Sequence, residues 1–478
     1  MSTNAPLDQE IRLLCQRYHA VLLTLDEQTV TIAIAGNVPP ALLTALKFAS
    51  NRHIEVEYWS QIRLEQALRP VTQAAEPDAV FSVVPTAMKA ADEDTPVIHY
   101  INQTLAQAFQ RRASDIHFEP MADNYRVRMR IDGVLHICTP PPQDWAARLT
   151  ARLKIMGQLD IAERRLPQDG QFSFSLNTQT FSLRIATLPV LEGEKVVLRV
   201  LQTYQQMLSL DSLGLSPEAH ACLTQALRQP QGMILATGPT GSGKTVTLYS
   251  AICWLNESQR NICSVEDPVE IPLPGINQTA LNTKAELDFS RILRALLRQD
   301  PDVVMIGEIR DGETAEIAVK AAHTGHLVLS TLHTNSAIET LTRLGHLGIP
   351  GYLLAGALTL IIAQRLVRRL CSHCKTPASQ PLTFPDALWP NPVPHWEPQG
   401  CEHCMNGYYG RTALYELLPL TPALRHALSR GASTQELAAL ANEAGYDTLF
   451  ISALQSVSQG KTSAAEMYRA IGVSPEPH

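Results

Sequence analysis

The sequence predicts an α/β protein built from several domains, and three observations support this fold class. At 478 residues the chain is too long for one hydrophobic core, so we expect roughly three or four domains. The composition, 45% hydrophobic and 18% charged, is that of an ordinary globular protein. Within residues 205–347, apolar strands alternate with helical segments, which is typical of a parallel sheet covered on both faces.

Residues 1–70 predict a small α/β module in which no catalytic residue is evident. Period-2 alternation indicates strands, and apolar residues at helical spacing indicate helices. The expected elements are, in chain order, a strand at 29–35, a helix at 40–49, a strand at 54–58 and a helix at 62–68. Residues 71–95 are rich in Ala, Pro, Asp and Glu without periodicity, so we predict a linker there.

Residues 96–204 predict an α+β domain, a mixed sheet with helices beside it. An amphipathic helix is expected at 97–109, and strands are expected at 125–131, 171–176, 181–188 and 195–201. The first of these strands carries Arg126, Arg128 and Arg130 at alternate positions, on one face of the sheet. Two interpretations remain open: a solvated face, or arginines that reach a nucleotide bound on a neighbouring surface.

The segment Gly238–Thr245, with the sequence GPTGSGKT, has the spacing of a phosphate-binding loop. It lies between the apolar run Met233–Ala236 and a helical segment at Val246–Ile252. Glycines let successive backbone N–H groups point at phosphates, and the helix N-terminus adds partial positive charge. We expect Lys244 to contact the β- and γ-phosphates and the Thr245 hydroxyl to bind Mg²⁺. The predicted nucleotide-binding residues of an NTPase are therefore Gly238, Pro239, Thr240, Gly241, Ser242, Gly243, Lys244 and Thr245.

Acidic residues follow two neighbouring apolar strands, where an NTPase needs groups that hold Mg²⁺ and orient the attacking water. Glu308 comes just after the strand at 303–306, which is the place of a Walker B acid. Glu266 ends the strand at 262–265 and is the candidate general base or water-positioning group. Asp302 lies at the start of its strand, so it is not expected to be the Mg²⁺ acid.

Three histidines surround the apolar strand at 327–331, namely His323, His326 and His333. A strand separates the outer two, so they should lie at opposite ends of it and are not expected to share a metal. His333, at the tip of the strand, fits a role as a polar group that senses the γ-phosphate.

Residues 348–478 are expected to form a mostly helical C-terminal region that carries a metal-binding element. Cys371 and Cys374 form one Cys-x-x-Cys pair, Cys401 and Cys404 form another, and 26 residues separate the pairs. Two such pairs can place four thiolates around one tetrahedral Zn²⁺, which would hold the proline-rich loop between them. Because there are two pairs, a redox role for either one is disfavoured.

Charge and hydropathy limit the environment of the protein. The N-terminus lacks a secretory signal, and the longest apolar stretch is well short of the roughly 20 residues that span a bilayer. A formal net charge of -7 argues against a broad nucleic-acid surface. We therefore expect a cytoplasmic protein that reaches a membrane only through a partner.

Seven motifs, in order over residues 96–470, resemble those of the ATPases of type II secretion and type IV pilus assembly. They are Ala113–Pro120, Arg130–Gly133, Arg165–Gly170, the phosphate loop, Val265–Glu270, Gly307–Asp311 and Thr331–Asn335. The resemblance implies a RecA-like P-loop domain preceded by a PAS-like α+β domain. It also implies a hexameric ring, an inner-membrane platform protein and a membrane-associated docking protein as partners, and ATP, Mg²⁺ and Zn²⁺ as ligands.

For individual residues, the resemblance implies an Asp-box role for Glu266, a Walker B role for Glu308 and a His-box role for His333. It also suggests arginines from the second domain at the nucleotide, and the candidates are Arg128, Arg130 and Arg184. The N-terminal region, a single small module here, departs from the extended one of the family, which leaves the docking partner open.

We expect a motor that assembles a filament and not one that retracts it. The tetracysteine element and the N-terminal module both resemble those of assembly members of the family. The sequence thus predicts a motor for a pilus or a secretion pseudopilus. The alternatives are a pilus-retraction ATPase, a DNA-uptake or DNA-handling motor, and a nucleotide-binding scaffold without turnover. The scaffold is disfavoured because Glu266 and Glu308 are both present.

Overall fold

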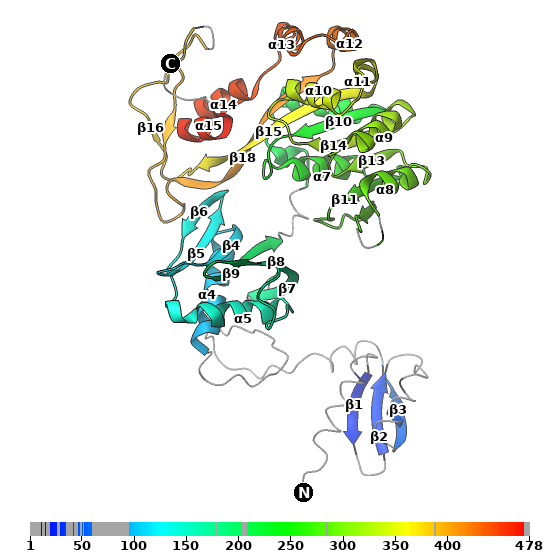
Figure 1. The fold of residues 1–478 in the computed structure, drawn as a ribbon, viewed down its shortest axis with the longest axis vertical. Helices are drawn as coiled ribbons and strands as arrows, with labels where there is room; N and C mark the ends of the chain where they lie inside the picture. Colours follow the sequence, from blue (N-terminus) through cyan, green and yellow to red (C-terminus); the bar gives the residue numbers. More distant parts are fainter. Residues whose placement is uncertain are drawn as a thin grey trace. The chain divides into compact units, whose positions relative to one another are not determined.

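The computed structural model describes most of the chain. It covers residues 95–472 apart from 177–178, 202–207, 283–284, 286 and 387–388, and in the N-terminal part residues 11, 15, 20–25, 29–34, 42, 46–47, 50 and 52–59. The chain forms two compact units, residues 1–80 and 81–478 (Figure 1). The helix predicted at 62–68 lies outside the described residues, as does the linker predicted at 71–95 except for Thr95. The finer division of residues 81–478 into domains stays a prediction.

The N-terminal unit contains a three-stranded sheet of β1 (Ala20–Leu25), β2 (Thr29–Ile34) and β3 (His53–Tyr58). β1 pairs with β2 antiparallel, and β2 pairs with β3 parallel. Strands β2 and β3 correspond to the two predicted strands, whereas β1 was missed. Alternate residues of β2, Val30 and Ile32, have no exposed surface, so the sheet packs one face against its own small core.

A six-stranded antiparallel sheet follows, in the order β6-β5-β4-β9-β8-β7. Its strands are β4 (Ala113–Pro120), β5 (Tyr125–Ile131), β6 (Val134–Ile137), β7 (Gln168–Leu176), β8 (Gln179–Val190) and β9 (Gly193–Leu201). The helices α4 (Thr95–Gln110) and α5 (Ala146–Met156) pack against it through a shared core. In β5, Val127 and Met129 point into this core, which leaves the alternate arginines on the other face.

The phosphate loop belongs to a seven-stranded sheet with the order β12-β11-β13-β14-β10-β15-β18. All neighbours pair parallel except β15 and β18, which are antiparallel. The strands are β10 (Gly232–Thr237), β11 (Ile262–Glu266), β12 (Asn277–Ala280), β13 (Val303–Ile306), β14 (Leu327–Leu332), β15 (Leu358–Leu370) and β18 (Tyr408–Pro419).

Helices cover both faces of this sheet, as the continuous apolar strands predicted (Figure 1). Met233 and Leu235 of β10 enter one core, and Ile234 and Ala236 enter the other. The helices are α6 (Pro217–Leu227), α7 (Lys244–Leu255), α8 (Phe289–Leu296), α9 (Gly312–His323), α10 (Ala337–His346), α11 (Gly351–Ala357), α12 (Pro422–Ser429), α13 (Thr434–Glu443), α14 (Leu449–Ser458) and α15 (Ala464–Ile471).

The expectation of a mostly helical region at 348–478 is wrong in one respect, because this region also supplies the long strands β15 and β18 to the sheet. β15 lies between β10 and β18 and is buried along most of its length, and its first half, residues 358–363, is a nearly continuous apolar run. Such a run does not distinguish a buried strand from a buried helix. The sheet therefore extends past residue 347, where the core was expected to end.

The β15–β18 hairpin carries the cysteine element at its end. β15 ends at Leu370, immediately before Cys371, and β18 begins at Tyr408, shortly after Cys404. Between them lies the short pair β16 (Thr376–Pro377) and β17 (Trp396–Glu397). Among the helices that the structure describes, none combines the length and apolar character needed to span a bilayer.

Candidate nucleotide and zinc sites

The phosphate loop joins β10 to α7 in the predicted order. Gly238, Gly241 and Gly243 have φ angles of 146°, 80° and 90°, a region that L side chains rarely adopt. A Cβ on Gly238 would lie 2.5 Å from the backbone oxygen of Gln364, so this glycine also permits a close approach of β15. Gly243 is the N-cap of α7 and gives it no side-chain cap, which leaves the first N–H groups of the helix available to an anion.

Two polar side chains of the loop fit a phosphate ligand. The Ser242 hydroxyl is buried and has no hydrogen-bond partner among the described residues, which is costly unless a ligand supplies one. The Lys244 ammonium donates to the backbone oxygens of Gly238 at 2.7 Å and Pro239 at 3.1 Å. The pKa of Lys244 is lowered to about 8, chiefly by burial; the charge of Glu308 opposes this shift and the charge of Arg365 adds to it. An added phosphate would satisfy both groups.

Glu308, two residues beyond the end of β13, lies in a cluster of charges. Arg310 donates a hydrogen bond to one carboxylate oxygen, and His333 Nε2 lies 3.3 Å from the other. Burial opposes the charge of Glu308, but these contacts with Arg310 and His333 hold its pKa below the ordinary value. Arg310 also lies 3.5 Å from Asp267, so its guanidinium bridges two carboxylates.

His333 thus lies beside Glu308, at the C-terminal end of β14. His323 precedes the other end of β14. Its Nε2 shares a hydrogen bond with the backbone oxygen of Leu353 at 2.9 Å. Asp302 accepts a hydrogen bond from the backbone N–H of Asn261 at 2.7 Å, a structural contact at the start of β13. The structure therefore brings Glu308 and His333 together.

Glu266 ends β11 and is 3% exposed. Three neutral donors hold its carboxylate: the Tyr249 hydroxyl on Oε2, and the Ser264 hydroxyl and Gln278 Nε2 on Oε1, the last at 3.0 Å. Tyr249 belongs to α7, the helix of the phosphate loop, and has no exposed surface. Glu266 is consequently anchored both to its own strand and to the loop's helix.

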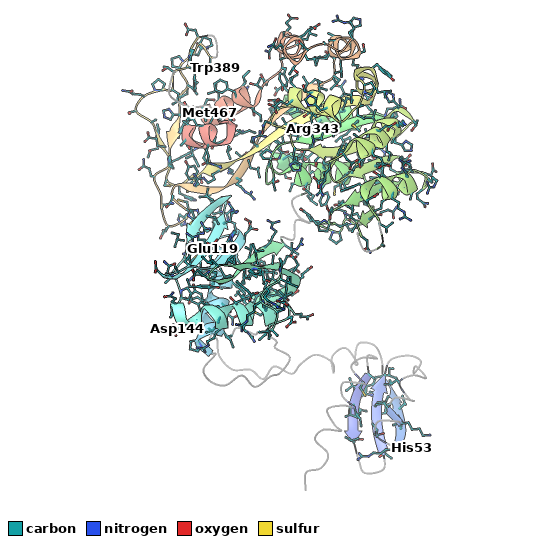
Figure 2. The ribbon with its side chains drawn as sticks, in the orientation of Figure 1. His53, Glu119, Asp144, Arg343, Trp389 and Met467 are labelled. Atoms are coloured by element: carbon teal, nitrogen blue, oxygen red, sulfur yellow. The ribbon has the colours of Figure 1, made fainter. Side chains whose placement is uncertain are left out.

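The candidate arginines of the α+β part pair with carboxylates of their own sheet. Arg128 binds Glu119, labelled in Figure 2, through two hydrogen bonds of 2.8 Å. Arg130 Nε lies 3.7 Å from Asp115, and Arg184 lies 3.5 Å from Asp169 with half of its side chain exposed. Their contact with a nucleotide stays a prediction.

Glu119 organises the charged face of this sheet. It also receives Arg126 at 3.0 Å and Lys195 at 2.9 Å. Burial opposes its charge, but hydrogen bonds from Arg128 and Lys195 lower its pKa to about 2. The solvated-face interpretation of the alternating arginines is thus incomplete, because Arg126 and Arg128 share the buried carboxylate of Glu119 and Arg130 lies beside that of Asp115.

The four paired cysteines converge at the end of the β15–β18 hairpin. Their sulfur atoms all lie within 4.8 Å of one another. Three of the Sγ–Sγ separations are 3.7 to 3.8 Å, those of Cys371–Cys401, Cys374–Cys404 and Cys401–Cys404. Tetrahedral zinc with Zn–S bonds of about 2.3 Å requires sulfur separations of about 3.8 Å. The separations are far too long for disulfides of about 2.05 Å, and all four cysteines are free.

Backbone groups support this thiolate arrangement. The N–H of Gly400 points at Cys374 Sγ at 3.3 Å, and the N–H of Cys401 points at Cys404 Sγ at 3.2 Å. The N–H of Cys371 donates to the backbone oxygen of Gly407 at 2.9 Å, which ties the first cysteine pair to the segment that follows the second. Donors aimed at sulfur favour the anionic form that a metal needs.

With this geometry known, the family can be stated from comparison with other proteins. The family described as "Type II/IV secretion system protein" matches residues 90–469. The chain belongs to this family. The family expected from the seven motifs is thereby confirmed, over nearly the same residues.

Three relatives illustrate the range of this family. The "Protein transport protein HofB homolog" of Escherichia coli (strain K12) is 52% identical, covering 98% of this chain and 99% of that protein. The "Type IV pilus assembly ATPase PilB" of Pseudomonas aeruginosa is 49% identical, covering 80% of this chain and 68% of that protein. The "Type II secretion system protein E" of Pectobacterium carotovorum is 41% identical over 93% of each.

Among solved structures, the pilus retraction motor PilT with bound ADP is 26% identical, with a TM-score of 0.52 over 79% of this chain and 97% of that one. The Legionella pneumophila ATPase DotB, at 21% identity and a TM-score of 0.57 over 81% of this chain and 97% of that one, shows likeness of fold alone. The mixed α/β architecture is therefore that of secretion ATPases.

Sequence reasoning missed several residues that the structure places at the site. Tyr249 and Gln278 on Glu266, and Gln364 behind the loop, come from separate segments and carry no motif of their own. Arg310 belongs to the motif Gly307–Asp311, but the sequence of this motif does not show that the Arg310 guanidinium bridges Glu308 and Asp267. Only the pairing of β11, β13 and β15 with their neighbours brings these side chains together.

Proposed function

We propose that this chain is a Mg²⁺-dependent ATPase that powers assembly of a type IV pilus or a type II secretion pseudopilus. One observation carries the proposal. Proteins named as a pilus assembly ATPase and a type II secretion protein are 41% to 49% identical to the chain. The loop geometry, the orphaned Ser242 hydroxyl and the strand-end carboxylates support nucleotide chemistry independently of those names.

In the proposed reaction, Lys244 leaves its own loop oxygens and binds the β- and γ-phosphates, while the backbone of residues 238–245 surrounds them. Mg²⁺, held in part by Thr245, supplies charge neutralisation on the phosphate oxygens. Glu266 orients the attacking water, and Glu308 serves as the Walker B acid. His333, in contact with Glu308, reports the γ-phosphate to α10 and the rest of the C-terminal part.

The proposed assembly is a homohexamer in which a RecA-like domain follows a PAS-like α+β domain. Binding of ATP closes neighbouring protomers and hydrolysis reopens them, which moves an inner-membrane platform protein. In this scheme arginines of the α+β domain, Arg128, Arg130 or Arg184, reach a nucleotide. Arg184 is the most accessible of the three, being half exposed with one ion pair at 3.5 Å.

The cysteine element is proposed to hold one structural Zn²⁺. The sulfur spacing and the N–H groups aimed at Cys374 and Cys404 favour this ion. Four protein ligands leave no open position for catalysis, so the ion would act as a cross-link that fixes the end of the β15–β18 hairpin.

We further propose that the protein is cytoplasmic and peripheral at the inner membrane, where a platform protein and a docking protein hold it. The alternative of a retraction ATPase is disfavoured because the pilus assembly relatives are 43% to 49% identical while the retraction motor PilT is 26% identical. A DNA-handling motor is disfavoured by the net charge of -7, and stimulation of hydrolysis by DNA would revive it.

Hydrolysis of ATP by the purified protein tests the site assignment. Lys244→Ala removes the ammonium and is expected to abolish turnover with the fold intact, because that ammonium contacts loop oxygens rather than the core. Glu308→Gln preserves shape and is expected to bind ATP without turning it over. Wild-type rates in either variant would contradict the assignment, and absence of turnover in the wild-type hexamer with Mg²⁺ would contradict the proposed activity.

A further inference from the structure

We propose that Tyr249 is a positioning residue for Glu266, holding the carboxylate from the helix of the phosphate loop so that one of its oxygens faces the attacking water. The inference rests on the proposed ATPase activity. It adds a residue that no motif of the chain marks.

The Glu266 carboxylate is hydrogen-bonded at three of its acceptor positions. A carboxylate offers about four acceptor positions, two on each oxygen. Ser264 and Gln278 occupy Oε1, and Tyr249 occupies one position on Oε2. One position on Oε2 is left, which suits a single oriented water and not a metal that needs several oxygens from the protein.

Tyr249 lies on the helix that follows the phosphate loop. It is fully buried in the second turn of α7, five residues after Lys244, while Glu266 ends the neighbouring β11. The same helix therefore presents Lys244 at its N-terminus and, one turn later, the hydroxyl that fixes Glu266. A displacement of the loop on phosphate binding is transmitted to the carboxylate through one rigid element.

The Tyr249 hydroxyl is itself held in place. Its oxygen accepts a hydrogen bond from the backbone N–H of Glu270 at 3.3 Å while its proton goes to Glu266. The hydroxyl consequently has a fixed rotation, and it can donate in one direction only. In this chain of hydrogen bonds the Glu270 N–H donates to Tyr249, and Tyr249 donates to Glu266.

The test is a double-mutant cycle on steady-state hydrolysis with the full-length, zinc-loaded protein. Tyr249→Phe deletes only the hydroxyl and is expected to lower kcat by roughly 10- to 100-fold, the effect of losing one hydrogen bond to a charged group. The KM for ATP and the affinity for MgADP should change less than about twofold, because Tyr249 does not face the phosphates.

The decisive comparison is made in a Glu266→Gln background. If Tyr249 acts through Glu266, adding Tyr249→Phe to Glu266→Gln lowers kcat no further. The matched control is Tyr408→Phe, which removes another buried hydroxyl, bonded to Ser463 at 2.7 Å, and should leave kcat within about twofold of wild type. If Tyr249→Phe does not fold, Tyr249→Met, which also removes the hydroxyl bound to Oε2 and keeps an apolar side chain, is carried through the same cycle.

Three results would overturn the inference while the ATPase activity stands: an unchanged kcat in Tyr249→Phe, an equal loss in the wild-type and Glu266→Gln backgrounds, or full activity in Glu266→Gln. A wild-type protein that hydrolyses no ATP would instead contradict the proposed function itself. The two failures are thus distinguished by the wild-type measurement alone.

Discussion

The affinity of the site for nucleotide should fall as pH rises from 7 to 9, because Lys244 has a pKa of about 8 in the nucleotide-free protein. Its ammonium is the group that meets the phosphates, and burial makes that charge unusually easy to lose. At pH 7 about nine-tenths of the molecules carry the charge, and at pH 9 about one-tenth do. If only the charged form binds, the apparent Kd for MgADP rises about tenfold between these pH values.

Nucleotide binding and protonation of Lys244 are linked, so binding should take up protons. The folded-state pKa of Lys244 lies below its ordinary value of 10.5, so the free site binds fewer protons than an exposed lysine between about pH 8 and 10. Phosphates next to the ammonium favour the charged form and raise that pKa again. Binding should therefore take up about half a proton per site near pH 8.

Isothermal titration calorimetry with MgADP, in buffers of different ionisation enthalpy, measures both quantities. Lys244→Arg is the control, since a guanidinium stays charged over this range and the pH dependence of its affinity should be flat. A wild-type Kd that is constant within about twofold from pH 7 to 9, without proton uptake, would refute the reasoning about Lys244.

Two further outcomes follow from the C-terminal part. The protein should contain one zinc per chain, and its affinity for zinc should fall as pH falls because the ligands are thiolates. The zinc site would be contradicted if elemental analysis found no metal and Cys371→Ser had the same thermal stability as wild type. Glu466, 1% exposed, accepts hydrogen bonds from Arg368 and Arg469, and although burial opposes its charge these bonds lower its pKa to about 2. Its stabilisation is therefore present above about pH 4.5 and is lost as pH falls toward 2. Glu466→Gln should lower the free energy of unfolding by about 2 kcal/mol at pH 7, after allowance for solvent screening. Calorimetric unfolding of this variant that does not differ from wild type at pH 7 would contradict this expectation.

The parts of the fold that could be predicted were those with a strong local signal. Residues 303–306 and 125–131 form strands with the bounds that their sequences indicated, because each combines apolar residues with clear ends. The phosphate loop was equally clear, since its glycines are required by backbone angles that other residues rarely adopt. Sequence spacing also identified the four cysteines that converge.

The parts that could not be predicted depend on tertiary contacts. The long strand β15 was not recognised, because its first half, residues 358–363, is a buried apolar run without a period that separates strand from helix. Tyr249 looks like an ordinary core residue of α7 until β11 is placed beside it. Likewise the sequence left open whether the alternating arginines were solvated or reached a nucleotide, and it did not show that Glu119 binds Arg126 and Arg128 from the next strand.

The central claim, that this ATPase drives filament assembly, is tested most directly by counting surface filaments or pseudopili in cells of the source organism that carry Lys244→Ala in place of the wild-type gene. The variant keeps the fold and the cysteine element but lacks the phosphate-binding ammonium. The account predicts that such cells make no filament of the cognate system and that the wild-type gene restores it. Cells with more and longer filaments than normal would show that the protein is a retraction motor, and would contradict the account.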